Sequence, residues 1–195
     1  ELPHFDRAKL LVRSNVVTNA INELGNVIIQ NGLERAVGVC LLHKHFDVKS
    51  NEILLETNHD NTSKLAPVAS SSIKDEVLPY MWKMGKDMCW SPLEFVYNTE
   101  QNKDAFGKVM QNEGFLRTVG MIMLQLKVDD ILGLSLLHRD HISGAAGGTM
   151  ETTNEISREL TVVPLDKTVK CDHHETVQTL WKFGTRQMDE DVCNH

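Results

Sequence analysis

Ala36-Val-Gly-Val-Cys-Leu-Leu-His-Lys-His-Phe46 is the stretch that decides the predicted fold, because Ile131-Leu-Gly-Leu-Ser-Leu-Leu-His-Arg-Asp-His141 repeats its frame. Both contain Gly-x-x-Leu-Leu-His followed by a basic residue, and matching positions such as His43 and His138 are 95 residues apart (138 minus 43). Each is a short apolar run with an internal glycine, which favours a buried central strand over a helix. A helical pattern precedes each run. The sequence therefore predicts pseudo-repeated helix-strand-strand units over about 8–57 and 101–164.

Histidines at the ends of these two strands form the first candidate site. Side chains alternate along a strand, so His43 and His45 share a face, and His138 matches His43. If the two strands are neighbours, we expect the three imidazoles to converge as catalytic residues, with Asp140 or His141 as additional ligands. Imidazoles bind zinc and other transition metals and also serve as general acids or bases. The open alternative is that each ring is satisfied by a backbone carbonyl where its strand reaches the surface.

Length and composition place limits on the class of protein. The chain has 195 residues, which suits a single domain over 1–195, and a net charge of −7 without a basic cluster. Nucleic acids and anionic membranes are therefore not expected as partners. No apolar run reaches the length of a membrane span. Four dispersed cysteines are typical of a reducing compartment, so we expect a cytoplasmic protein.

The remaining patterns predict an α+β fold with a mixed or antiparallel sheet and helices packed on it. One helix is expected from Asp6 or Ser14 to Gln30, and another over 101–127 that Gly114 divides or kinks. Polar residues 58–72 predict a surface loop. Further strands are expected at 53–57, as the hairpin partner of the first histidine strand, and at 92–97, 160–164 and 177–183.

A second candidate site lies in the C-terminal strand and tail, 171–195. Cys171 and His174 precede the last predicted strand, and Cys193 and His195 follow it. These are the ligand types of a structural Cys₂His₂ zinc site, which would fix a tail that lacks a core of its own. The open alternative is that they are ordinary exposed polar residues.

Three segments carry a resemblance to other proteins. Val37-Gly-Val-Cys-Leu-Leu-His-Lys-His-Phe-Asp47, Asn51-Glu-Ile-Leu-Leu-Glu56 and Ser91-Pro-Leu-Glu-Phe95 resemble a group of uncharacterised fungal proteins with a Leu-Leu-His-basic-His-Phe segment. The resemblance implies a fungal intracellular protein and carries no activity.

Three functions fit these patterns. The first is a small-molecule enzyme, of fungal specialised metabolism, that uses the histidine cluster as metal ligands or as general acid and base. Aromatic and methionine residues in 77–98, including Tyr80, Trp82 and Met84, would wall its pocket or belong to the core. The second is a non-catalytic ligand-binding module, and the third is an interaction protein stabilised by zinc. The expected cofactor is zinc or another transition metal, and the expected partner is a small-molecule ligand.

Overall fold

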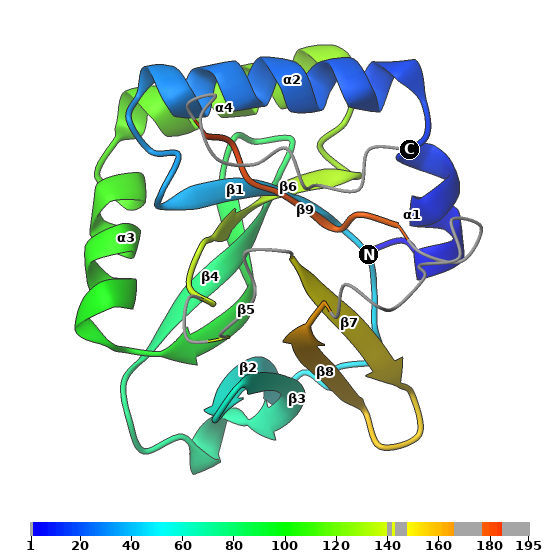
Figure 1. The fold of residues 1–195 in the computed structure, drawn as a ribbon, viewed down its shortest axis with the longest axis vertical. Coiled ribbons are helices and arrows are strands. Elements are labelled where there is room, and N and C mark those ends of the chain that lie inside the picture. Colours follow the sequence, from blue (N-terminus) through cyan, green and yellow to red (C-terminus); the bar gives the residue numbers. More distant parts are fainter. Residues whose placement is uncertain (1, 140–141, 143–147, 166–176, 185–195) are drawn as a thin grey trace.

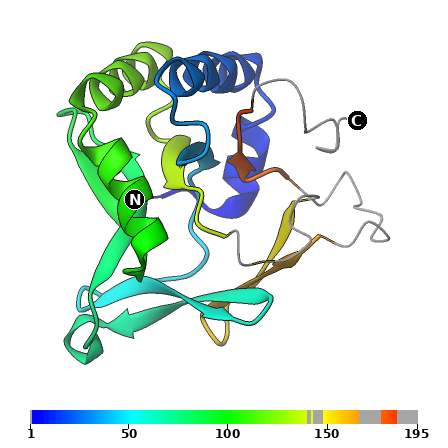
Figure 2. The ribbon, with the colours of Figure 1, turned by 60° about the vertical axis from the view of Figure 1, so that its left-hand side comes forward.

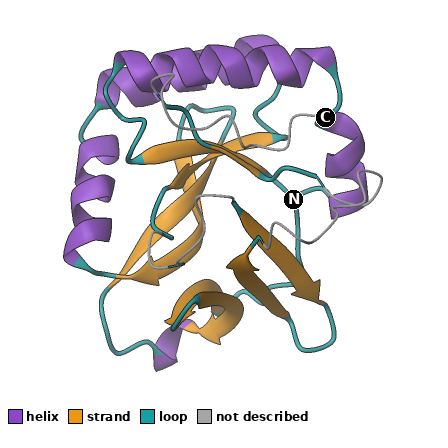
Figure 3. Ribbon diagram, viewed as in Figure 1, coloured by secondary structure: helices purple, strands orange, loops and turns teal. Residues whose placement is uncertain are grey.

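A single mixed sheet organises the computed structural model, which describes residues 2–139, 142, 148–165 and 177–184 (Figure 1). Four α-helices and nine strands occur in these residues, which gives the α+β class that the sequence predicts (Figure 3). The strand order is β7 (Thr149–Asn154), β8 (Glu159–Pro164), β3 (Thr62–Ala69), β2 (Glu52–His59), β5 (Trp90–Tyr97), β4 (Val77–Met84), β6 (Leu132–Leu136), β1 (Val37–Leu41) and β9 (Leu180–Trp181). All neighbours in the described sheet are antiparallel except β2 and β5, which are parallel.

The helices cover one end of this sheet. α2 (Asn15–Gln30) and α4 (Glu113–Leu126) lie side by side over β1, β4 and β6, and α3 (Glu100–Met110) packs beside β4 (Figure 2). The apolar face of α2 is buried in the main core, with Leu24 and Ile28 fully buried. The hairpins β2–β3 and β7–β8 lie at the other end of the molecule, around a smaller apolar cluster that contains Leu65, Leu160 and Val162.

Helix boundaries follow local capping chemistry. The first predicted helix is two helices, α1 (Phe5–Leu11) and α2, because Ser14 leaves the helical conformation and its Oγ accepts a hydrogen bond from the Val17 amide. The second helical region also divides, although not at Gly114. Asn112 caps α4 by accepting from the Phe115 amide, so Gly114 lies in the first turn of α4.

The two repeated stretches are neighbours in the sheet, as the sequence analysis anticipated. β1 and β6 pair antiparallel, and Val39 lies directly opposite Leu134. Glycine is needed at this seam because a Cβ on Gly133 would lie 2.5 Å from the carbonyl oxygen of Trp82, and one on Gly38 would lie 2.6 Å from that of Trp181. The pseudo-repeat of whole helix-strand-strand units stays a prediction.

Three local predictions differ from the structure. The strand predicted at 53–57 is confirmed as part of β2, but its expected hairpin with the first histidine strand is wrong, because β2 pairs with β3 and β5 and not with β1. Residues 58–72 contain β3 in place of the predicted loop, because a turn at Asp60, with φ of 49°, returns the chain antiparallel to β2. The final strand, predicted over 177–183, is limited to Leu180–Trp181.

Candidate functional site

The antiparallel register decides where the strand histidines lie. His43 follows the end of β1 and His138 follows the end of β6, so the two leave the paired strands at opposite ends. His43 contacts His45, with ring centroids 4.4 Å apart, and no contact among the described residues joins His138 to either ring. The structure therefore brings together His43 and His45 but not His138.

Both strand histidines have the same local hydrogen bond. Nδ1 of His43 lies 3.0 Å from the carbonyl oxygen of Leu41, and Nδ1 of His138 lies 3.1 Å from that of Leu136. A carbonyl only accepts, so each Nδ1 carries the proton and donates it. Each ring is thus hydrogen-bonded to a backbone carbonyl, which was the alternative to a catalytic role. Only Nε2 of each ring remains for contacts with other groups.

His138 is fixed in a buried ion pair. Its Nε2 lies 3.1 Å from Oε1 of Glu56, which is fully buried, and its ring packs on Tyr80 at a centroid distance of 4.2 Å. Burial acts to raise the pKa of Glu56, but Arg139 and His138 together hold it well below its ordinary value. Both nitrogens of the His138 ring thus lie beside acceptor oxygens, Nδ1 beside the Leu136 carbonyl and Nε2 beside the Glu56 carboxylate.

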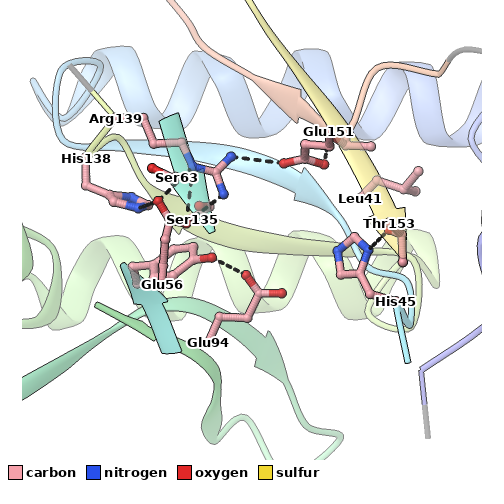
Figure 4. A network of polar contacts seen from close by, with 12 residues as sticks. Leu41, His45, Glu56, Ser63, Glu94, Ser135, His138, Arg139, Glu151 and Thr153 are labelled. Carbon is pink, nitrogen blue, oxygen red and sulfur yellow. Dashed lines mark hydrogen bonds and ion pairs between the residues drawn. The ribbon is translucent and has the colours of Figure 1, made fainter. Parts of the chain in front are cut away.

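Arg139 joins two carboxylates from different hairpins (Figure 4). Its Nη2 donates to Oε2 of Glu56 at 2.8 Å, and its Nη1 donates to Oε1 of Glu151 at 2.9 Å. The hydroxyl of Thr179 donates to the other oxygen of Glu151 at 3.0 Å. Burial acts to raise the pKa of Glu151, but Arg139 and the adjacent histidines lower it. The guanidinium thereby holds two ionised groups, one on β2 and one on β7.

Glu94 has a different environment. It lies on β5, is 5% exposed, and accepts a hydrogen bond from the Tyr80 hydroxyl. Burial raises the pKa of Glu94 to about 7, although the Tyr80 hydrogen bond and Arg139 partly oppose the shift. Glu94 is therefore a carboxyl that gains and loses its proton near neutral pH, beside two carboxylates that stay ionised.

Glu94, Arg139 and Glu151 line a small cavity of about 20 Å³. A volume of this size holds one water-sized group. Burial lowers the pKa of both His43 and His45, so both rings are neutral at pH 7. Nδ1 of His45 lies 3.0 Å from the Thr153 hydroxyl. The polar residues that line the cavity are Cys40, His43, His45, Tyr80, Glu94, Ser135, Arg139, Glu151 and Thr179.

The predicted metal sites find no support in the described residues. Nowhere in this part of the chain do three or more His, Cys, Asp or Glu side chains gather closely enough to hold an ion. Asp140 and His141, proposed as additional ligands of the strand histidines, lie outside the described residues. The same holds for the four candidate zinc ligands of the tail, Cys171, His174, Cys193 and His195.

The sequence analysis missed the carboxyl groups of this site. Glu56 follows Ile53-Leu-Leu55, and Glu94 stands between Leu93 and Phe95, so each acidic residue interrupts the apolar pattern of a strand. An acidic side chain inside such a pattern is costly unless it has a partner, and this was the available signal. Trp82, Met84 and Tyr80, which were expected in a pocket wall or in the core, all lie in the core, and Tyr80 also lines the cavity.

Two further findings concern the chain as a whole. None of the described helices has the length and apolar character needed to cross a membrane. No protein-family model, curated protein or solved structure matched this chain.

Proposed function

We propose that this protein is a small-molecule enzyme in which Glu94 acts as general acid or base. The observation that carries the proposal is a buried carboxyl, with its pKa raised to about 7, that lines a polar cavity. A general acid or base works best when its pKa lies near the working pH. Glu94 meets this condition mainly because it is buried, and the neighbouring carboxylates of Glu151 and Glu56 also raise its pKa.

The other carboxyls support the assignment of roles. When the surroundings of neighbouring carboxyl groups give them different pKa values, the group with the raised pKa can transfer a proton and the others keep a fixed negative charge. Glu56 and Glu151 are held ionised by Arg139, while Glu94 exchanges its proton. Tyr80 is a positioning residue, because its hydroxyl fixes the orientation of the Glu94 carboxyl.

His43 and His45 remain candidates in this proposal, with a narrower role than the sequence predicts. Both line the same cavity as Glu94, and both are neutral at pH 7. Neutral imidazoles there would accept hydrogen bonds from a substrate and orient it. His138 would act indirectly, through its ion pair with Glu56.

A non-catalytic ligand-binding module is the second candidate. The observation that favours it is the cavity volume of about 20 Å³, which accepts only one small group of a larger ligand. A cytoplasmic location and a zinc-binding tail also stay proposals. The first is supported by the free thiols of Cys40 and Cys89, and the second by the ligand types of the tail alone.

A comparison of variants tests the enzyme proposal. The wild-type protein, Glu94→Gln and the control Glu155→Gln, at an exposed position, are incubated with a mixture of small metabolites, and turnover is followed by mass spectrometry. We expect Glu94→Gln to lose at least about 100-fold in rate, because general acid–base catalysis contributes about 10²–10⁴-fold. Glu155→Gln should match the wild type, and circular dichroism checks that both variants fold.

The pH dependence of the same reaction gives an independent result. The wild-type rate should show a limb with a midpoint near pH 7, which corresponds to the Glu94 proton. Equal turnover by the wild type and Glu94→Gln would overturn the enzyme proposal. A metabolite that is bound but not converted would support the binding module instead.

A further inference from the structure

The cavity is lined by hydrogen-bond acceptors, which favours a ligand that donates hydrogen bonds. His43 uses Nδ1 to donate to Leu41, so its Nε2 is an acceptor. Ser135 donates its hydroxyl proton to the carbonyl of Leu136, which leaves oxygen lone pairs. Glu94 presents a carboxyl to which, among the described residues, only the Tyr80 hydroxyl donates. A group with several N–H or O–H donors matches these three acceptors.

The charges around the cavity favour a cation. Two carboxyls, Glu94 and Glu151, line it against one guanidinium, that of Arg139. That guanidinium is already shared between Glu56 and Glu151, and the two lining histidines are neutral at pH 7. An incoming anion would meet Glu94 and Glu151, whereas a cation would stabilise the ionised form of Glu94.

We propose that the cavity binds the protonated primary amine of a small substrate, with the Glu94 carboxylate as its ion-pair partner. This inference rests on the proposed function and names the class of substrate for the same site. A primary ammonium group has three N–H donors and is close to a water molecule in size, which suits a cavity of about 20 Å³. A transition-metal ion fits less well, because no three metal-ligating side chains converge in the described residues.

Amine binding and the ionisation of Glu94 are coupled. The titratable or charged groups near Glu94 come from several elements, so each has to be considered. Arg139 and the ionised Glu56 and Glu151 keep fixed charges, and burial raises the pKa of the Cys40 and Tyr80 groups, so neither ionises near pH 7. His43 and His45 are neutral above their lowered pKa. Among these groups, Glu94 is thus the one whose pKa lies near 7, and it releases its proton as the amine enters.

Isothermal titration calorimetry with methylammonium chloride tests the proposal on the wild-type protein. At constant ionic strength, binding should be roughly tenfold tighter at pH 8 than at pH 6, because only the ionised Glu94 pairs with the cation. At pH 7, titrations in two buffers with different ionisation enthalpies should show proton release on binding. Absence of binding at pH 8, or an affinity that does not depend on pH, would overturn the amine assignment.

Matched controls identify the ligand class. Glu94→Gln should weaken methylammonium binding at least about tenfold at pH 8, since a buried charge partner is lost, and Glu155→Gln should leave it unchanged. Tetramethylammonium, which is larger and has no N–H donor, should not bind. Equal binding of potassium ions or of tetramethylammonium, or tighter binding of acetate, would each contradict a primary-amine site.

Failure of this inference can be told apart from failure of the proposed function. Carbon-13 NMR of the Glu94 side chain reports its titration directly. If Glu94 titrates near pH 7 and turnover depends on it, but methylammonium does not bind, only the substrate class is wrong. If Glu94 titrates near its ordinary pKa, the proposed acid–base role falls as well.

Discussion

Glu56 and Glu94 show how two buried carboxyls on adjacent strands acquire opposite properties. Glu56 has the charged guanidinium of Arg139 and the ring of His138 as partners, whereas Glu94 has, among the described residues, the neutral hydroxyl of Tyr80. A charged partner offsets the cost of removing a carboxylate from water, and a hydroxyl offsets much less of it. Glu56 is therefore ionised at neutral pH. Ionisation of Glu94, by contrast, destabilises the folded protein.

Glu94→Gln should stabilise the protein at high pH. Between its ordinary pKa of 4.5 and its folded value of about 7, Glu94 holds a proton in the folded protein that the unfolded chain has released. Stability therefore falls as pH rises through this window, by on the order of 3 kcal/mol. Glutamine has no such proton, so the free energy of unfolding of Glu94→Gln should rise relative to wild type between pH 4.5 and pH 8.

Urea unfolding at the two pH values measures this difference. Glu155→Gln should follow the wild type at each pH. If Glu94→Gln lost stability equally at pH 4.5 and pH 8, the side chain would be a packing element and its raised pKa would be disproved.

Arg139 should be far more important to stability than an arginine at the surface. Arg139→Met leaves the buried Glu56 and the half-buried Glu151 without the guanidinium that they share, and breaking a buried ion pair in this way costs about 3–5 kcal/mol. Arg158→Met removes an ion pair with Glu52 near the surface, where the arginine side chain is 29% exposed and solvent screens the charges, so it should cost much less. Urea unfolding at pH 7 compares the two variants, and equal losses would contradict a special role for the buried network.

Strand pairing gathers residues that the sequence keeps far apart. β2 and β5 run parallel, with Leu54 opposite Glu94, so Glu56 and Glu94 face the same side of the sheet. The antiparallel pairing of β1 and β6 has the reverse effect on the repeated histidines, because it sends the ends of the two strands in opposite directions. The directions of these two strand pairs therefore bring the carboxyl groups of Glu56 and Glu94 together and keep His138 away from His43 and His45.

The seam between β6 and its neighbours should not tolerate a side chain at Gly133. Alanine there would place Cβ 2.5 Å from the Trp82 carbonyl oxygen and 2.7 Å from Cδ2 of Leu42, so backbone has to move. We expect Gly133→Ala to cost about 1–3 kcal/mol. Gly107→Ala is the matched control in α3, where the nearest atom is 3.9 Å away, and it should stabilise by about 0.5–1 kcal/mol. Thermal unfolding followed by circular dichroism tests both, and a neutral Gly133→Ala would contradict the close packing.

The two ends of the molecule differ in the size of their apolar cores. The main core lies between α2, α4 and the strands β1, β4 and β6, whereas the hairpins at the other end share a small apolar cluster. In the described sheet, β7 forms one edge and has β8 as its sole strand partner. Regions with few buried apolar contacts open at lower free energy than the main core.

Hydrogen–deuterium exchange should therefore be slowest in β1, β4 and β6 and faster in β7 and β8. Val162→Ala removes apolar contacts from the small cluster and should speed exchange in β8 and β3 while leaving β1 unchanged. Uniform exchange rates along all the described strands would show instead that the sheet opens as one cooperative unit.

Local information in the sequence determined much of the fold. Apolar runs with an internal glycine mark β1 and β6, helical spacing marks α2 and α4, and the Ser14 side chain fixes where α2 begins. These features depend on residues within a few positions of one another, so they can be recognised without knowing the rest of the structure. The α+β class follows from them. β3 was predicted as a loop because its polar residues follow a run of turn-forming residues, which is also typical of surface loops.

Only the tertiary structure decided which side chains form the site. Glu56, Glu94 and Glu151 lie on three strands, and Arg139, which pairs with Glu56 and Glu151, follows a fourth, so their meeting depends on strand order and direction. The pKa of Glu94 depends on how completely other segments bury it, which has no local signature in the sequence. Strand pairing and desolvation arise from contacts between distant segments, and for this reason the chain's chemistry becomes visible only once it is folded.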